Sequence, residues 1–217
     1  MKTLDVRLKE GREYRDIPPL ERIEGDEKIV EGYATTFNQP YELFRDAFDG
    51  NIVIFREQVD PNAFHNTDMA DVIMQYNHEG RVFARTKNGT LALNADLNGL
   101  HIRADLGGTE IGRQLYEEIE GGYTDKMSFG FRVSKDKVEK TEERDENGTV
   151  IVNVLRTIQE ISKLYDVSAV SIPANDATSI SARNFCDGVV AEIKGEFLER
   201  ERRERQKRKI KLLMEVK

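Results

Sequence analysis

Short runs of alternating apolar and polar residues dominate the middle of the chain and predict a β-rich domain. Residues 28–37 are rich in β-branched and aromatic side chains and end at an Asn-Gln-Pro turn, as a strand does. Asn-Gly pairs at 88–89 and 98–99 and a hairpin-like centre at 146–148 favour antiparallel connections, because tight hairpin turns need positive φ. Proline 173 is expected to end the sheet, since it has no N–H to donate. The other expected strands are residues 71–78, 81–85, 90–97, 100–106, 126–133, 149–161 and 164–172.

Two segments instead have helical spacing. Residues 109–120 place Ile111, Leu115, Tyr116 and Ile119 on one face after a threonine N-cap, and two glycines follow. From residue 189 onward the composition is also helical, but residues 199–209 contain no apolar side chain. Glutamates there precede arginines by four residues at 199/203, 201/205 and 204/208, an order that supports a solvated helix.

This pattern divides the chain into three parts. We expect a flexible leader at residues 1–26, a folded domain at 27–186 and a charged helical tail at 187–217. The net charge of −7 is unevenly spread: residues 189–217 hold ten Lys and Arg against six Glu, a net +4, so residues 1–188 carry −11. An acidic body argues against nucleic acid as a partner, because such binding needs clustered cations.

Composition excludes several other classes. No apolar run is long enough to cross a bilayer, and the N-terminus lacks the apolar core of a secretory signal. The single cysteine, Cys186, cannot form an internal disulfide or a cysteine-based zinc site, so we expect a cytosolic protein held together by packing. Asp60, Asp68 and Asp71 around His65 are the one candidate metal cluster, and we interpret them as solvated carboxylates and expect no metal.

The three histidines are the candidates for a catalytic base. His78 is the best placed, because it is expected at the end of the strand 71–78, where the backbone holds it rigidly at the edge of a cleft. His65 follows a short helical turn, and His101 lies within a hairpin strand. Taken alone, each histidine is also compatible with a structural role.

Ser128 is the candidate nucleophile. Strand alternation places Met127, Phe129 and Phe131 on the core face, and Ser128 and Gly130 on the other face. Gly130 leaves nothing to pack beside Ser128, and strand glycines of this kind mark places where a ligand comes close. Lys126 and Arg132 on the same face are expected to add positive charge for a developing oxyanion.

One other nucleophile and two candidate acids remain to be considered. Cys186 is disfavoured because the neighbouring Asp187 opposes thiolate formation. Asp166 is a carboxylate within an apolar strand, and it needs a partner because burying an unpaired charge is costly. His78 could be that partner. Alternatively, Asp166 has a structural role, in a salt bridge or as a backbone cap. Glu160 is the competing candidate for the acid.

In order along the chain, four motifs resemble the prohead maturation proteases of tailed bacteriophages. They are Glu-Gly-Tyr-Ala at 31–34 with a Phe at 37, Tyr-Asn-His at 76–78 with an Arg at 85, Met-Ser-Phe-Gly-Phe at 127–131, and Tyr-Asp-Val-Ser at 165–168 leading to Pro-Ala-Asn at 173–175. The resemblance covers about residues 28–183. It implies an α+β protein with a mostly antiparallel β-barrel flanked by helices, like the related herpesvirus assemblins. It also implies a serine endopeptidase with His78 as base and Ser128 as nucleophile. Asp166 falls where the family has an acid, most often Glu.

The resemblance also implies a biological role. The enzyme would act without a cofactor inside the procapsid in the host cytoplasm, cleaving the scaffolding segment of the major capsid protein and itself. Oxyanion donors would be backbone N–H groups, for which the loop after proline 173 is one candidate. Self-association stays open. The alternative is a catalytically silent assembly or scaffolding module that binds the capsid shell through the charged tail.

Overall fold

The computed structural model describes residues 13–17, 21–22, 27–170 and 180–215, whose strands form two sheets. The larger sheet has the order β1-β10-β11-β5-β4, with β6 pairing with β11 and with β7, and the smaller has the order β2-β3-β9-β8. The strands are β1 (Glu13–Ile17), β2 (Glu21–Arg22), β3 (Ile29–Thr36), β4 (Tyr41–Phe48), β5 (Asn51–Val59), β6 (Ile73–Tyr76), β7 (Glu79–Arg85), β8 (Leu91–Ala95), β9 (Gly99–Asp105), β10 (Lys126–Arg144) and β11 (Val150–Val170). The helices are the 3-10 turn η1 (Thr86–Asn88), α2 (Glu110–Glu120) and α3 (Ile180–Glu215).

The α+β class is confirmed, with strands predominating and a long helix at the C-terminal end. The barrel is not: among the described strands, the pairing closes neither sheet on itself, because β4 and β8 each end a row. Most pairs are antiparallel, but β11 runs parallel to both β5 and β6.

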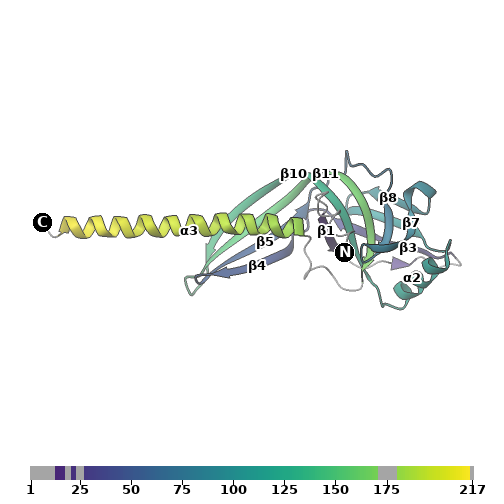
Figure 1. Ribbon diagram of the computed structural model, residues 1–217, viewed down its shortest axis with the longest axis horizontal. Helices are drawn as coiled ribbons and strands as arrows, with labels where there is room; N and C mark the ends of the chain where they lie inside the picture. Colours follow the sequence, from purple (N-terminus) through teal and green to yellow (C-terminus); the bar gives the residue numbers. More distant parts are fainter. Residues whose placement is uncertain (1–12, 18–20, 23–26, 171–179, 216–217) are drawn as a thin grey trace.

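A long ribbon made of β10 and β11 joins the two ends of the body (Figure 1). We expected two strands at 149–161 and 164–172, but β11 is continuous. The strand expected at 126–133 is longer than predicted, since β10 extends to Arg144. The predicted hairpin centre is confirmed: the Asp145 carboxylate accepts backbone N–H bonds from Asn147 and Thr149. Register shifts between Gly130 and Asp136 bend the ribbon without breaking it.

Two apolar cores hold the fold together. The larger core lies between the sheets and includes Val30, Ile102, Phe129 and Phe131, so the predicted core face of β10 is confirmed. The smaller core packs one side of α3 against β5 and β11. Beyond this contact α3 continues as the long helix that projects from the body in Figure 1, and its residues 199–214 are exposed.

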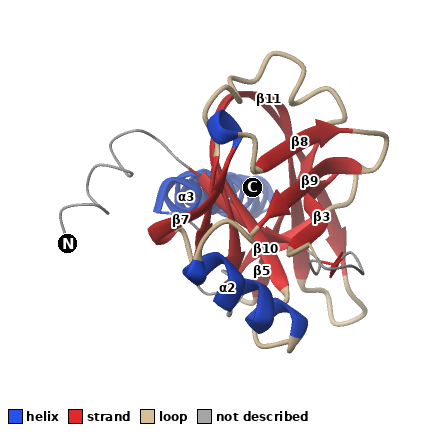
Figure 2. Ribbon diagram, turned by 90° about the vertical axis from the view of Figure 1, so that its right-hand side faces the viewer, coloured by secondary structure: helices blue, strands red, loops and turns tan. Residues whose placement is uncertain are grey.

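The helix α2 confirms its prediction closely. Thr109 caps it by accepting a bond from the Gly112 N–H at 3.0 Å, and Leu115, Tyr116 and Ile119 are buried. It lies beside the strand-rich body in Figure 2. None of the described helices is long and apolar enough to span a membrane.

Some local predictions were wrong. The Asn-Gly pair at 88–89 does not close a hairpin, because β7 and β8 belong to different sheets. The pair at 98–99 does join paired strands, but Gly99 is required for another reason: a Cβ there would lie 1.9 Å from the Thr35 carbonyl oxygen. The β4–β5 hairpin, with positive φ at Asp49 and Gly50, was not predicted.

The three-part division of the chain stays a prediction. Residues 13–17 and 21–22, expected within the flexible leader, form β1 and β2. The boundary expected at 186/187 falls inside the continuous helix α3. The Pro-Ala-Asn motif at 173–175 lies outside the described residues.

Candidate active site

His78 occupies the two-residue turn between β6 and β7. Both turn residues have positive φ, +48° at Asn77 and +58° at His78, and Tyr76 pairs with Glu79 across the hairpin. This is the geometry of a type I′ turn, which asparagine and histidine tolerate better than most residues. We expected His78 to be the last residue of the strand 71–78, but β6 ends two residues earlier, at Tyr76. The imidazole therefore leaves the hairpin at its tip.

The hairpin tip is fixed to the adjacent strand. The Asn77 N–H donates to the Ala169 carbonyl of β11 at 2.9 Å, next to the parallel pairing of β6 with residues 166–169. The Gln75 side chain spans the hairpin to the Gly80 carbonyl at 3.3 Å. Strained backbone conformations of this kind persist where the surroundings hold them, often at functional sites.

Ser128 lies on β10, directly opposite Ser168 of β11. Because paired residues of antiparallel strands share a face, the polar face of β10 meets the face of β11 that carries Asp166 and Ser168. Gly130 is the residue opposite Asp166, so no side chain stands between β10 and that carboxylate. Three neighbouring strands thus bring the three predicted residues together.

A chain of hydrogen bonds links these residues. His78 Nε2 lies 2.6 Å from Ser128 Oγ, and His78 Nδ1 lies 2.5 Å from Asp166 Oδ1. A carboxylate can only accept, so Nδ1 carries the proton and Nε2 is free to accept the one from Ser128. The arrangement can deprotonate the serine hydroxyl and hold the resulting imidazolium against a negative charge.

The three side chains are shielded from solvent. Ser128 is 0% exposed and Asp166 2%, whereas the His78 side chain is 14% exposed. Low polarity around the three groups strengthens their electrostatic interactions. Ser128 therefore differs from an ordinary exposed strand serine.

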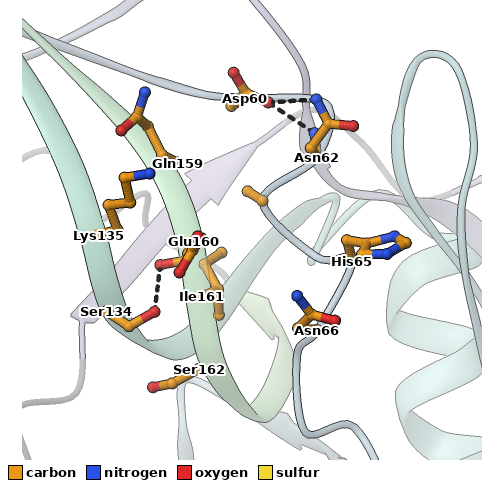
Figure 3. Close-up of a pocket in the computed structure, with 11 residues that line it drawn as sticks. Asp60, Asn62, His65, Asn66, Ser134, Lys135, Gln159, Glu160, Ile161 and Ser162 are labelled. Atoms are coloured by element: carbon orange, nitrogen blue, oxygen red, sulfur yellow. Dashed lines mark hydrogen bonds between the residues drawn. The ribbon is translucent and has the colours of Figure 1, made fainter.

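The competing acid, Glu160, lies elsewhere. It is exposed and pairs in register with Lys135 across the bent part of the ribbon. Together with His65 and Asp60 it lines a polar cavity of about 530 Å³, shown in Figure 3. In that view the His65 ring and the Glu160 carboxylate belong to opposite walls of the cavity.

The other candidate residues contact groups other than Ser128. His101 packs edge-on against Tyr33, with ring centroids 5.2 Å apart. Cys186 belongs to α3 and is buried in the smaller core. Arg132, expected near a developing oxyanion, lies over the ring of Tyr165 at 5.8 Å. The loop after proline 173, a candidate for oxyanion donors, lies outside the described residues.

Two of the three aspartates considered with His65 as a metal cluster, Asp68 and Asp71, have cationic partners. Arg85 donates two hydrogen bonds to Asp71, at 2.6 and 2.7 Å, and Lys87 adds an ion pair at 2.8 Å. The bond from Arg85, followed by that from Lys87, holds the pKa of Asp71 well below its usual range. Hydrogen bonding to Lys163 likewise lowers the pKa of Asp68. Over the described residues, no three His, Cys, Asp or Glu side chains gather in a way that could hold a metal ion.

Sequence reasoning missed one member of the polar cluster. Ser168 is fully buried, and its Oγ donates to Asp166 Oδ1 at 3.1 Å. Its position two residues after Asp166 on a strand places it on the same face. That spacing was the available signal.

Comparisons with known proteins identify the family of this chain. A model of the caudovirus prohead serine protease family matches residues 18–188, a range that includes all three residues of the hydrogen-bonded chain. The prohead protease of Enterobacteria phage HK97 is 29% identical over 170 residues, which cover 76% of this chain and 64% of that protein. The match thus spans less than two thirds of that relative's length. No solved structure matches the chain significantly.

Proposed function

Because the chain belongs to the caudovirus prohead serine protease family, we propose that it is a serine endopeptidase with Ser128 as nucleophile, His78 as general base and Asp166 as orienting acid. The observation that carries the proposal is the continuous contact from Ser128 Oγ through both ring nitrogens of His78 to Asp166. A base within hydrogen-bond reach of a nucleophile, and itself oriented by a third group, is the arrangement that acyl transfer requires.

The proposed reaction has two halves. Ser128 Oγ attacks a peptide carbonyl while His78 Nε2 takes the hydroxyl proton, and the imidazolium then gives that proton to the leaving amine. Water next enters, loses a proton to His78 and releases the acyl group as an acid. Asp166 keeps the Nδ1 proton in place and stabilises the imidazolium throughout.

The proposed substrates are the major capsid protein, which is cleaved at its scaffolding segment, and the enzyme itself. Both would be cleaved inside the procapsid in the host cytoplasm. The names of the family and of the HK97 relative support a role in prohead maturation. No cofactor is required for the mechanism proposed.

Co-expression with the capsid protein of the same phage tests this function. Ser128→Ala and His78→Ala should each abolish shortening of the capsid protein and of the enzyme. Ser162→Ala is the matched control, because Ser162 is an exposed serine of β11 whose Oγ donates to the Arg132 carbonyl, and it should process normally. Processing at the wild-type rate in either of the first two variants contradicts the proposal.

The acid is tested separately. Asp166→Asn keeps the shape but presents an amide to His78 Nδ1, which favours the wrong tautomer, so the rate should fall by several orders of magnitude, about 10⁴ in the best-studied triad. Glu160→Gln should leave the rate unchanged, since Glu160 lines the separate cavity of Figure 3. The reverse result would assign the acid to Glu160.

The exposed end of α3 favours a second function beside catalysis, which is docking to the capsid shell. Ile210, Leu212, Leu213 and Met214 are more than half exposed on a helix rich in charge. A chain that remains intact but enters procapsids through this helix would be a scaffold, whereas self-shortening that depends on Ser128 identifies a protease.

A further inference from the structure

Ser168 stands in a position that packing alone does not explain. It lies two residues before the end of β11, is 0% exposed, and is flanked by Val167 and Ala169, whose side chains belong to the larger core. Burying a hydroxyl is unfavourable unless it finds a hydrogen-bond partner. An alanine would fill the site without that cost, so the partner of the hydroxyl is the feature to explain.

That partner is the carboxylate that faces His78. Ser168 Oγ donates to Asp166 Oδ1 at 3.1 Å, and the same oxygen contacts His78 Nδ1 at 2.5 Å. Within the described part of the chain, these two are the side-chain partners that the structure gives Asp166. A second donor on one carboxylate oxygen stabilises the ionised form and limits rotation of the group.

We propose that Ser168 is a positioning residue: its hydroxyl holds the Asp166 carboxylate turned so that Oδ1 meets His78 Nδ1. The inference rests on the proposed function and extends the hydrogen-bonded chain to a fourth residue. Ser168 itself forms no bond with the substrate. Its effect on the reaction passes through Asp166 and then through the imidazole.

The proposal predicts a particular pH dependence. Without the hydroxyl, the negative charge of Asp166 is less compensated, and this favours the protonated imidazole, which cannot accept the Ser128 proton. The acid limb of the rate-against-pH profile should therefore move to higher pH. A residue that only fills space would not move that limb.

The test measures the rate at which a fluorophosphonate labels Ser128 in the full-length protein, from pH 5 to 9. Ser168→Ala should slow labelling about ten- to a hundredfold, the range expected for losing a hydrogen bond to a charged group. Ser168→Thr restores the hydroxyl and should recover most of the rate. Ser162→Ala, an exposed serine on the same strand, should match the wild type.

Each outcome is decisive. Two outcomes overturn the positioning role while leaving the protease proposal intact. One is a labelling rate for Ser168→Ala within twofold of wild type. The other is a slower rate with an unmoved acid limb and no recovery in Ser168→Thr. Wild-type protein that is never labelled at Ser128 refutes the protease proposal and, with it, this one. Should Ser168→Ala fail to fold, Ser168→Cys, which has nearly the same shape but a weak donor, takes its place and should be slowed similarly.

Discussion

Replacing Arg156 by methionine should lower the free energy of unfolding by about 3–5 kcal/mol, because it leaves buried carboxylates without their cation. The Arg156 guanidinium donates to Glu13 at 2.7 and 3.0 Å, to Glu57 at 2.9 Å and to Asp136 at 2.6 Å. The side chain of Arg156 is 5% exposed and that of Glu57 0%. Arg156, Glu57 and Glu13 are therefore almost entirely out of water, whereas the Asp136 side chain is 28% exposed.

Electrostatics in this cluster favour the charged arginine despite its burial. Burial alone would lower the pKa of Arg156, but the hydrogen bonds that Arg156 donates to Glu13 and the negative charge of Glu57 outweigh it and raise this pKa above its usual value. Three acids surround one cation here. Removing that cation leaves negative charges that repel one another in a medium of low polarity, which explains why the expected loss is large.

The matched control is Arg200→Met. Arg200 also donates two hydrogen bonds to one carboxylate, Glu142, at 2.8 Å each, but the two side chains are 55% and 40% exposed. Exposed pairs of this kind contribute about 0–1 kcal/mol, since water screens them. The two substitutions therefore remove similar contacts in different surroundings.

Urea denaturation at neutral pH, followed by circular dichroism, measures both effects. A loss of about 3–5 kcal/mol corresponds to a fall in the melting temperature of roughly 6–20 °C for a chain of this size. A loss for Arg156→Met no greater than that for Arg200→Met would show that burial does not strengthen the Arg156 cluster. A double variant with Glu57→Gln should recover part of the loss, because one of the stranded charges is then removed.

Three further predictions concern other parts of the chain. Because Arg85 lowers the pKa of Asp71, the pair stabilises the fold fully above the ordinary carboxylate pKa and progressively less as the pH falls toward the lowered value. The urea midpoints of wild type and Asp71→Asn should therefore differ at pH 7 and converge in strong acid. A difference that stays constant with pH would contradict this. Gly99→Ala should destabilise the fold by about 1–3 kcal/mol through overpacking, whereas Gly188→Ala, in open space on α3, should stabilise it by about 0.5–1 kcal/mol. Equal melting temperatures for the two variants would contradict this. Deleting residues 199–217 should leave the labelling rate of Ser128 unchanged, because residues 199–214 are exposed; a large fall would place the tail in the catalytic machinery.

The strand period made the site partly predictable from sequence. Alternation along β10 assigned Phe129 and Phe131 to the core and Ser128 to the other face, and the packing confirms that assignment. The choice of Asp166 as a carboxylate that needs a partner followed from its apolar neighbours. In the structure it contacts His78.

The parts that sequence could not predict depend on long-range pairing. The parallel register of β11 with β6, which brings Asp166 beside the hairpin that carries His78, joins segments about 90 residues apart and leaves no local pattern. The turn at Asn77 and His78 lacks the glycine that normally marks such turns, so the strand was extended through it. The buried contacts of Glu13 with Arg156 were missed because a single charged residue in a polar segment resembles a solvated one.

Labelling with a fluorophosphonate, followed by mass spectrometry of the modified peptide, identifies the nucleophile of this protein. We expect modification at Ser128, lost in Ser128→Ala and strongly slowed in His78→Ala, with Cys186 and the other serines unmodified. Modification at another residue, or labelling at Ser128 that does not depend on His78, would contradict this expectation.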